Sequence, residues 1–250
     1  KLINYLDDNN IALIEDVCES HGATHKGKRV GSFGIMSNFS FYYAHHMSTI
    51  EGGMVCTNDE QTYQNLRMLR SHGMVREASN SSTVRGYQEN YPDLNPQFIF
   101  AFPAYNMRNN EIGAILGRKQ LKRLDANNAI RSRNQERFLS GINPVAYKDD
   151  FFTEGSSNYA FNLVLKRKDN VLMKRLMGLL EKNGVEYRRG SAGGGNQLRQ
   201  PYLENVVGAE SWRNFPATEH IHFYGMYIGN FPDLSLKEVD EIVSIINQAV

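Results

Sequence analysis

Polar side chains that can do chemistry follow short apolar runs in the first quarter of the chain. Asp16 comes soon after the apolar run at residues 11–14, and the adjacent imidazoles His45 and His46 follow the aromatic run at residues 39–43. Short apolar runs that end in polar residues are typical of buried strands, and ligands collect at the carboxyl ends of strands in open α/β sheets. The pattern predicts a ligand site at one edge of a sheet.

The same residue types argue against a metal centre. Adjacent histidines in an extended strand point to opposite faces, so His45 and His46 are poorly placed to bind one metal ion together. The two cysteines, Cys18 and Cys56, are too few for the four thiolates of an iron–sulfur cluster. We therefore expect no metal, no disulfide framework and a reducing, cytoplasmic environment.

The composition limits the kinds of partner. The 28 basic and 27 acidic residues give a net charge of +1 and are spread along the chain, which does not favour nucleic acid binding. No apolar run approaches the length that crosses a bilayer, so we expect no membrane segment. With 250 residues, of which 41% are apolar, the chain is long enough to bury a substantial core.

An ordered series of short motifs covers residues 15–59. The motifs are EDVCESHGA at 15–23, GSFG at 31–34, FSFYYAH at 39–45, EGG at 51–53 and TND at 57–59. The series resembles the active-site core of the DegT/DnrJ/EryC1/StrS family of pyridoxal-phosphate (PLP) sugar aminotransferases. The resemblance implies an α/β fold of the aspartate-aminotransferase-like (type I PLP) class.

One position departs from the family pattern. Where the family carries the lysine that forms a Schiff base with PLP, this chain has His45. An imidazole cannot make that link, so ordinary transamination is closed to this chain. The replacement resembles a small branch of the family, the PLP-dependent 3-dehydratases of 4-keto-6-deoxyhexoses. Lys26 and Lys28 lie in a predicted hairpin turn, far in sequence from this position, and do not replace the lysine.

The resemblance implies a role for each polar residue of the motifs. Asp16 matches the carboxylate that faces the pyridine nitrogen of PLP, and a protonated ring acts as an electron sink. Ser40 matches the serine that donates to the cofactor phosphate. Glu19 lies where the family often has glutamine, within reach of the ring hydroxyl. His45 is then the catalytic acid and base, since imidazole exchanges protons near neutral pH.

Each of these residues also has a structural interpretation. Without the motifs, Asp16 would be taken for a strand-end or N-cap carboxylate, Ser40 for a packed strand residue, and Glu19 for a solvated helix residue. His21 is predicted to be a packed histidine rather than a catalyst, and His46 to be structural.

A second region resembles the family at residues 105–108, which read YNMR. The family's asparagine in this motif reaches across a dimer interface to the phosphate of the neighbouring subunit's PLP. The resemblance implies that Asn106 contacts the cofactor in this way and that the protein is a homodimer with shared active sites. The alternative is that Asn106 caps the helix predicted after it.

Three further residues are candidates for substrate binding. His72 and Arg76 lie at and after the end of a helix predicted at residues 60–74, and Arg188 lies in a strand predicted at residues 185–189. An arginine pairs well with a diphosphate or a carboxylate. A solvated surface position is the competing interpretation of all three.

In the 3-dehydratases that this chain resembles, an amino donor such as L-glutamate converts PLP to pyridoxamine phosphate (PMP). PMP reacts with the 4-keto group of a nucleotide-linked deoxysugar, whose 3-hydroxyl then leaves. We favour the type that acts on GDP-4-keto-6-deoxymannose, on the way to colitose in lipopolysaccharide O-antigen, because the type acting on CDP-sugars carries an iron–sulfur cluster. The alternatives are a nucleotide-sugar aminotransferase, a CDP-hexulose 3-dehydratase and a non-catalytic regulator that binds PLP or a nucleotide sugar.

The order of elements predicts two domains. Residues 1–125 are expected to be the remainder of a large PLP-binding domain with a mixed sheet, and residues 126–250 a linker helix and a small C-terminal α/β domain. Compared with the family, the N-terminal portion of the large domain is expected to be missing. The other predicted elements are a helix at 111–138, strands at 53–57, 158–165 and 223–228, a helix at 171–183, a glycine-rich loop at 190–200 and a capping box at Ser235.

Overall fold

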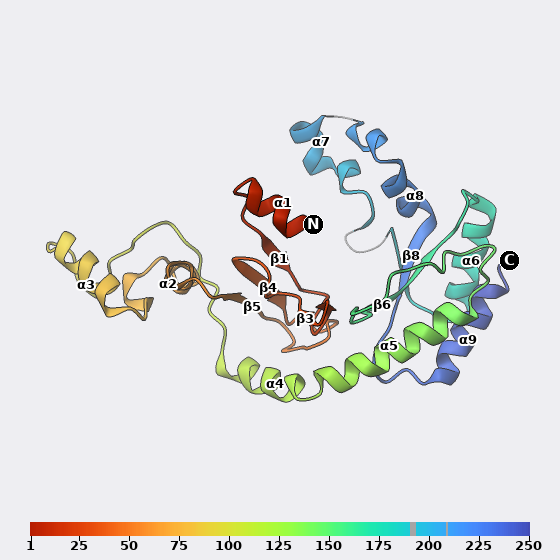
Figure 1. Ribbon diagram of the computed structural model, residues 1–250, viewed down its shortest axis with the longest axis horizontal. Helices are drawn as coiled ribbons and strands as arrows, with labels where there is room; N and C mark the ends of the chain where they lie inside the picture. Colours follow the sequence, from red (N-terminus) through yellow and green to blue (C-terminus); the bar gives the residue numbers. More distant parts are fainter. Residues whose placement is uncertain (191–193, 209) are drawn as a thin grey trace. The chain divides into compact units, whose positions relative to one another are not determined.

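The computed structural model describes residues 1–190, 194–208 and 210–250 (Figure 1). It divides into two compact units, Lys1–Leu124 (unit 1) and Asp125–Val250 (unit 2). Within the described residues, each unit contains one three-stranded sheet, and unit 1 also contains a two-stranded hairpin. Each unit is described by itself.

The sheet of unit 1 is mixed. Its strands are β1 (Ile14–Asp16), β4 (Met36–Ser40) and β5 (Gly53–Thr57), in the order β1-β4-β5. β1 and β4 are parallel, with Asp16 opposite Asn38, whereas β4 and β5 are antiparallel. Because parallel strands end at the same edge, the residues that follow β1 and β4 are brought together there.

The structure has a strand at Ile14–Asp16 (β1) rather than at the predicted residues 11–14. Pairing with β4 begins only at Ile14, so the acidic pair that was expected to follow the strand is part of it. Ile11 and Ile14 are 49% and 57% exposed, so the prediction of a buried strand is wrong for the chain as described. The apolar run marked the strand, but the hydrogen-bonding register of β4 sets its limits.

The predicted hairpin turn is confirmed. It joins β2 (Thr24–His25) to β3 (Lys28–Arg29), which pair antiparallel. Lys26 and Gly27 both have positive φ, at 50° and 77°, as a two-residue type I′ turn requires. Lys28 places its ammonium 4.6 Å from the ring centre of Phe33, so it is held at the hairpin.

A carboxylate fastens the loop between the hairpin and β4. Glu15 accepts hydrogen bonds from the backbone N–H groups of Gly31, Phe33 and Gly34, at 2.6, 2.6 and 2.7 Å. Burial raises the pKa of the Glu15 carboxyl, but the three N–H groups outweigh it and hold the pKa below its usual value. Only glycine fits at Gly34, because a Cβ there would lie 2.4 Å from the carbonyl oxygen of Leu13.

Short helices precede and follow the strands of unit 1 along the chain. They are α1 (Leu2–Asp8), α2 (Glu60–Leu69), η1 (Val75–Glu77), α3 (Ser81–Asn90) and α4 (Glu111–Leu121). The helix predicted at residues 60–74 ends at Leu69, because His72 and Gly73 take positive φ, at 61° and 74°. A small core of Met68, Val75, Ala78 and Ile99 lies beneath this turn.

Unit 2 packs helices against an antiparallel sheet. The strands are β6 (Ala160–Val164), β7 (Tyr187–Arg189) and β8 (Gly225–Gly229), with β8 in the centre. The helices are α5 (Leu124–Gly141), α6 (Asn170–Lys182), α7 (Pro201–Val207), α8 (Pro216–Tyr224) and α9 (Leu236–Asn247). Phe138 of α5 stacks on Phe161 of β6, with ring centres 4.5 Å apart, in a core that α6 and α9 complete (Figure 1).

The structure corrects several predicted helix and strand boundaries in unit 2 and in the helical segment that leads into it. The single helix predicted at residues 111–138 is two helices, because Arg123 N–H closes a tight turn on the carbonyl of Gln120. The strand predicted at residues 223–228 starts at Gly225, since α8 continues to Tyr224. The capping box is confirmed at Ser235 and Glu238. Residues 191–193 of the predicted glycine-rich loop lie outside the described residues.

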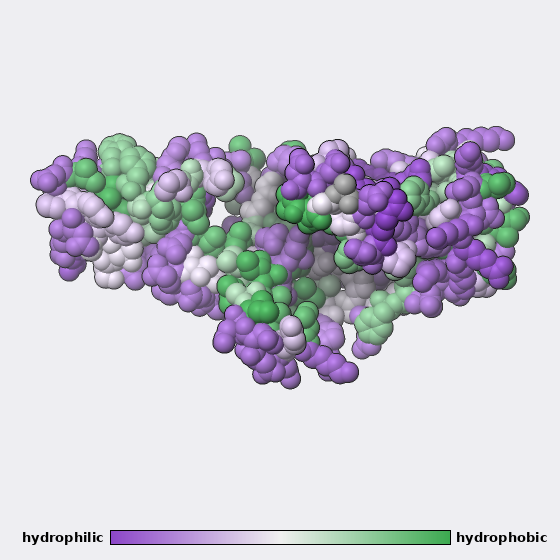
Figure 2. Space-filling model, turned by 90° about the horizontal axis from the view of Figure 1, so that it is seen from above, coloured by the Kyte–Doolittle hydropathy of each residue, from purple (hydrophilic) through white to green (hydrophobic). Residues whose placement is uncertain are grey.

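The face of the molecule seen in Figure 2 is largely polar but carries apolar patches. On α4, Ile112 and Ile115 are 73% and 61% exposed. Among the described residues, no helix combines the length and the apolar character needed to cross a membrane.

We expect Glu15→Gln to weaken unit 1 by about 3 kcal/mol, because the amide replaces a charged acceptor and turns donors toward backbone N–H groups. The measurement is the opening free energy of the β1 and β4 amides by native-state hydrogen exchange. Glu89→Gln, at an exposed position of α3, is the matched control and should change nothing. Equal protection in both variants would contradict the role of Glu15.

Candidate active site

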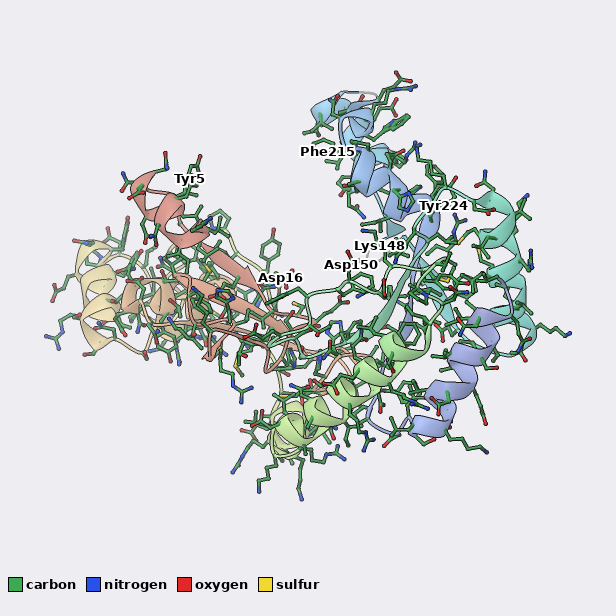
Figure 3. All side chains as sticks on the ribbon, turned by 45° about the vertical axis from the view of Figure 1, so that its right-hand side comes forward. Tyr5, Asp16, Lys148, Asp150, Phe215 and Tyr224 are labelled. Carbon is green, nitrogen blue, oxygen red and sulfur yellow. The ribbon has the colours of Figure 1, made fainter. Side chains whose placement is uncertain are left out.

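Four predicted site residues gather where β1 and β4 end. Asp16 is the last residue of β1 (Figure 3), and Ser40 is the last residue of β4. Glu19 and His45 follow these two strands, and their side chains approach each other. The parallel pairing of β1 and β4 therefore assembles residues that are up to 29 positions apart in the sequence.

Asp16 is exposed but well oriented. Its Oδ1 accepts the backbone N–H of Cys18 at 3.1 Å and the side-chain amide of Asn38 at 3.1 Å. Contacts with the thiol and N–H of Cys18, then Asn38 and the charge of His45, hold the pKa of the Asp16 carboxyl below its usual value despite partial burial. Asp16 is therefore a carboxylate at neutral pH, as a partner for a protonated ring nitrogen must be.

Cys18 is not a nucleophile at this site. Burial, and then the neighbouring Asp16, raise the pKa of its thiol to about 11. Nucleophilic chemistry needs the thiolate, which is scarce at neutral pH under these conditions. Asn38 also directs its amide toward the Cys18 sulfur at 3.3 Å.

The side chains of His45 and Glu19 face each other. The Nε2 atom of His45 lies 3.7 Å from Oε1 of Glu19, and their side chains are 12% and 39% exposed. The ring of Tyr42 meets the His45 ring edge-on, with centres 5.6 Å apart. Glu19 thus faces a potential acid/base group, rather than being only a solvated helix carboxylate.

Ser40 keeps a donor for a ligand. Its hydroxyl oxygen accepts the N–H of Tyr42 at 3.3 Å, which leaves the O–H proton to be donated elsewhere. The residue is half-buried at the end of β4. This geometry suits a serine that binds a phosphate oxygen.

His21 and His46 are packed, with exposures of 2% and 4%. The His21 ring lies among Phe39, Phe41 and His46, with centre distances of 5.6 to 5.9 Å. Burial, and then the charge of His45, lower the pKa of His21 to about 4. His21 is therefore a neutral wall of the site at physiological pH.

His72 and Asn106, two further predicted site residues of unit 1, lie on adjoining segments of the chain. The backbone N–H of His72 donates to the carbonyl of Tyr105 at 2.7 Å, and Ser71 forms a bridge with Asn106. Asn106 is exposed. The competing interpretation of Asn106 as a helix cap is wrong, because Asn110 caps α4 by accepting the N–H of Gly113.

Arg76 and Arg188 make contacts elsewhere. The Arg76 guanidinium donates to the carbonyl of Gln97 at 3.2 Å and lies 4.9 Å from the ring centre of Phe98. Arg188 is exposed on β7 of unit 2, opposite Tyr227, which raises its pKa. Neither set of contacts includes the cluster of Asp16 and His45, so the substrate roles of these arginines stay predictions.

Two residues that shape the site were not assigned a role from the sequence. Glu15 fastens the loop under the site, and Asn38 holds Asp16. A charged residue inside a strand, followed by a loop with two glycines, is a signal that points to Glu15. No local pattern points to Asn38, because its partner lies on another strand.

The donor set fits PLP. A carboxylate is present for the ring nitrogen and a hydroxyl for the phosphate, while an imidazole occupies the end of the motif that carries lysine in the family. The lysines of unit 1 are all exposed, at positions 1, 26, 28, 119 and 122. Within the described residues, no group of three or more metal-ligating side chains is found.

Comparison with known proteins finds relatives that use the chemistry suggested by this donor set. The family model described as "DegT/DnrJ/EryC1/StrS aminotransferase family" matches residues 1–247. A GDP-4-keto-6-deoxy-D-mannose 3-dehydratase of Escherichia coli O55:H7 is 32% identical over 95% of this chain and 61% of its own length.

Solved structures extend the comparison. The E. coli GDP-4-keto-6-deoxy-D-mannose-3-dehydratase with bound hydrated PLP has a TM-score of 0.85 and 30% identity over 98% of this chain and 62% of its own. A GDP-4-keto-6-deoxymannose-3-dehydratase with a trapped PLP-glutamate geminal diamine has a TM-score of 0.79 and 28% identity, with 98% and 63% covered. The chain has the α/β fold of PLP-dependent aminotransferases and spans about three fifths of the length of these relatives.

The lowered pKa of His21 predicts a stability that depends on pH. Because the folded state holds His21 neutral down to about pH 4, the unfolded state takes up the proton first as the pH falls below 6.5. The stabilisation is complete above pH 6.5, and we expect about 3 kcal/mol to be lost by pH 4.

The measurement is the opening free energy of unit 1 by hydrogen exchange at pH 7 and at pH 4. In His21→Phe the phenyl ring fills the same aromatic surroundings without titrating. The stability lost between pH 7 and pH 4 should therefore be smaller than in the wild type by about 3 kcal/mol. His25→Gln, at an exposed position of the hairpin, should keep the wild-type slope. Parallel slopes in all three proteins would show that His21 titrates normally.

Proposed function

Since the chain belongs to the DegT/DnrJ/EryC1/StrS aminotransferase family, we propose that the complete protein is a PLP/PMP-dependent sugar 3-dehydratase. The substrate is a GDP-linked 4-keto-6-deoxyhexose of the GDP-4-keto-6-deoxymannose type, which loses its 3-hydroxyl. The observation that carries the proposal is His45, which stands where the family has its Schiff-base lysine and lies in one cluster with Asp16 and Glu19.

Three residues of unit 1 would hold the cofactor. Asp16 would accept the hydrogen bond of the ring N–H, and Ser40 would donate to the phosphate. Glu19 would bind the ring hydroxyl. When bound, the cofactor supplies an amine for the 4-keto group and an electron sink for the elimination.

His45 moves the protons. In the proposed reaction His45 would be the acid and base, because an imidazole can take up one proton and then deliver one to the departing 3-oxygen. A lysine would instead hold the cofactor covalently and favour amino transfer. The exposed position of every lysine in unit 1 supports this division of roles and argues against the aminotransferase alternative.

The remaining partners follow from the relatives. L-glutamate as amino donor is supported by the relative trapped with a PLP-glutamate adduct. The GDP-linked substrate is supported by the names of the relatives. We propose that the protein acts in the cytoplasm, in the synthesis of O-antigen deoxysugars such as colitose. His72, Arg76 and Arg188 remain candidates for contacts to the nucleotide sugar.

A homodimer with shared sites completes the proposal. Asn106 is exposed on unit 1, which leaves it available for the proposed contact with the cofactor phosphate of a second subunit. α4 turns Ile112 and Ile115 outward, about one turn apart, with exposures of 73% and 61%. Apolar side chains exposed together are typical of protein–protein interfaces.

The decisive experiment is mass analysis of the product that the complete protein forms with PLP, L-glutamate and GDP- or CDP-linked 4-keto-6-deoxyhexose. We expect a 3-deoxy product and ammonia from the GDP-linked sugar. His45→Asn should lower turnover at least about 1000-fold, because the proton carrier is lost, while PMP still binds. His45→Lys should gain the absorbance of a covalent lysine–PLP link and lose dehydration.

His25→Gln is the control for loss of an imidazole far from the site, and it should keep wild-type turnover. An amino sugar as the product would contradict dehydration in favour of transamination. Absence of ammonia and of any product with the wild-type protein would favour a non-catalytic binding role.

Shared sites predict complementation between inactive variants. When His45→Asn and Asn106→Ala proteins are mixed and allowed to exchange subunits, each mixed dimer has one intact site if Asn106 acts in trans. We expect activity to return to about one quarter of wild type, since about half of the dimers are mixed. If Asn106 acts within its own subunit, no mixed dimer has an intact site and activity stays at the level of the separate variants.

A further inference from the structure

Asn38 stands next to the one carboxylate that the proposed chemistry requires. It lies in the middle of β4 and is opposite Asp16 in the parallel register of β1 and β4. Residues paired in this way project to the same face of a sheet. The contact is therefore built into the strand pairing rather than into a loop.

The hydrogen bonds of Asn38 have one consistent orientation. Its Nδ2 donates to Asp16 Oδ1 at 3.1 Å and points toward the Cys18 sulfur at 3.3 Å. An ionised carboxylate only accepts, so the amide nitrogen and not the amide oxygen must face Asp16.

The other contacts of Asp16 come from one neighbouring residue, Cys18, two positions along the same turn. The N–H of Cys18 donates to Oδ1, and its thiol also contacts the carboxylate. Asp16 is exposed, so solvent alone would leave its carboxyl group free to rotate. Asn38 supplies the contact from a second strand, and together the two donors engage Oδ1 and leave Oδ2 outside both bonds.

We propose that Asn38 is a positioning residue, which holds the Asp16 carboxylate so that it can accept the hydrogen bond from the ring N–H of a pyridoxal-type cofactor. The inference rests on the proposed function, because it needs such a cofactor at Asp16. Asn38 acts through Asp16 and does not itself touch the reacting atoms.

The competing explanation is that Asn38 only pins two strands together. The variant Asn38→Leu distinguishes positioning of Asp16 from pinning of the strands, because leucine has nearly the same shape as asparagine but no hydrogen-bond donor. Ser37→Ala is the matched control: Ser37 is the neighbouring residue of β4, points to the opposite face and donates to the carbonyl of Gly31 at 2.8 Å. If Asn38 only pinned the strands, Asn38→Leu would lower stability but leave the Asp16 titration and the cofactor affinity unchanged.

The first measurement uses the protein without cofactor. The carboxyl carbon of Asp16 is followed by NMR with labelled aspartate, and its signal is assigned with Asp16→Asn. We expect Asn38→Leu to raise the midpoint of the Asp16 titration by roughly half to one pH unit, since a donor to the ionised form is lost. Asn38→Asp should raise it further, because it adds a like charge.

The second measurement is the dissociation constant of PMP in the complete protein, from fluorescence titration. We expect a roughly ten-fold weakening in Asn38→Leu and less than about two-fold change in Ser37→Ala. If the wild-type protein binds PMP, and Asn38→Leu has the same Asp16 titration midpoint and the same PMP affinity as the wild type, this inference alone is overturned. No PMP binding by the wild-type protein would overturn the proposed function, and this inference with it.

Discussion

Two adjacent carboxylates in β1 are the constraint on which the site depends. Successive side chains of a strand point to opposite faces, so Glu15 and Asp16 serve different ends. Glu15 turns to the loop and binds three of its N–H groups, while Asp16 stays at the accessible edge. A shift of the register by one residue would exchange them, leaving the loop without its anchor and the site without its anion.

Electrostatics within the cluster have a consistent direction. Asp16 is held ionised, His21 is held neutral, and the Cys18 thiol is held protonated. Beside these fixed groups, His45 and Glu19 face each other, with His45 Nε2 3.7 Å from Glu19 Oε1. A site that is to exchange one proton at a time needs this separation of fixed from exchangeable groups.

The sequence predicted the mixed sheet, the hairpin, the capping box and a cluster containing Asp16 and His45. The predictions from the sequence are wrong where residues far away in the sequence set the limits or the contacts of an element. The apolar run at residues 11–14 suggested a strand that ends before its carboxylates, yet pairing with β4 draws Glu15 and Asp16 into β1. Periodicity joined α4 to α5 because a tight turn at Arg123 does not interrupt the apolar spacing. Asn38 was missed for the same reason, since its role exists only across a strand pair.

The absence of a buried lysine in unit 1 has a mechanistic consequence. A covalent anchor would hold the cofactor in place even with weak polar contacts, whereas a cofactor held only by hydrogen bonds depends on each of them. Under the proposed function, each polar contact at Asp16 and Ser40 would contribute directly to cofactor occupancy. Asn38, which donates to Asp16, would then matter more in this chain than in a relative with lysine, because orienting the carboxylate would also help to retain the cofactor.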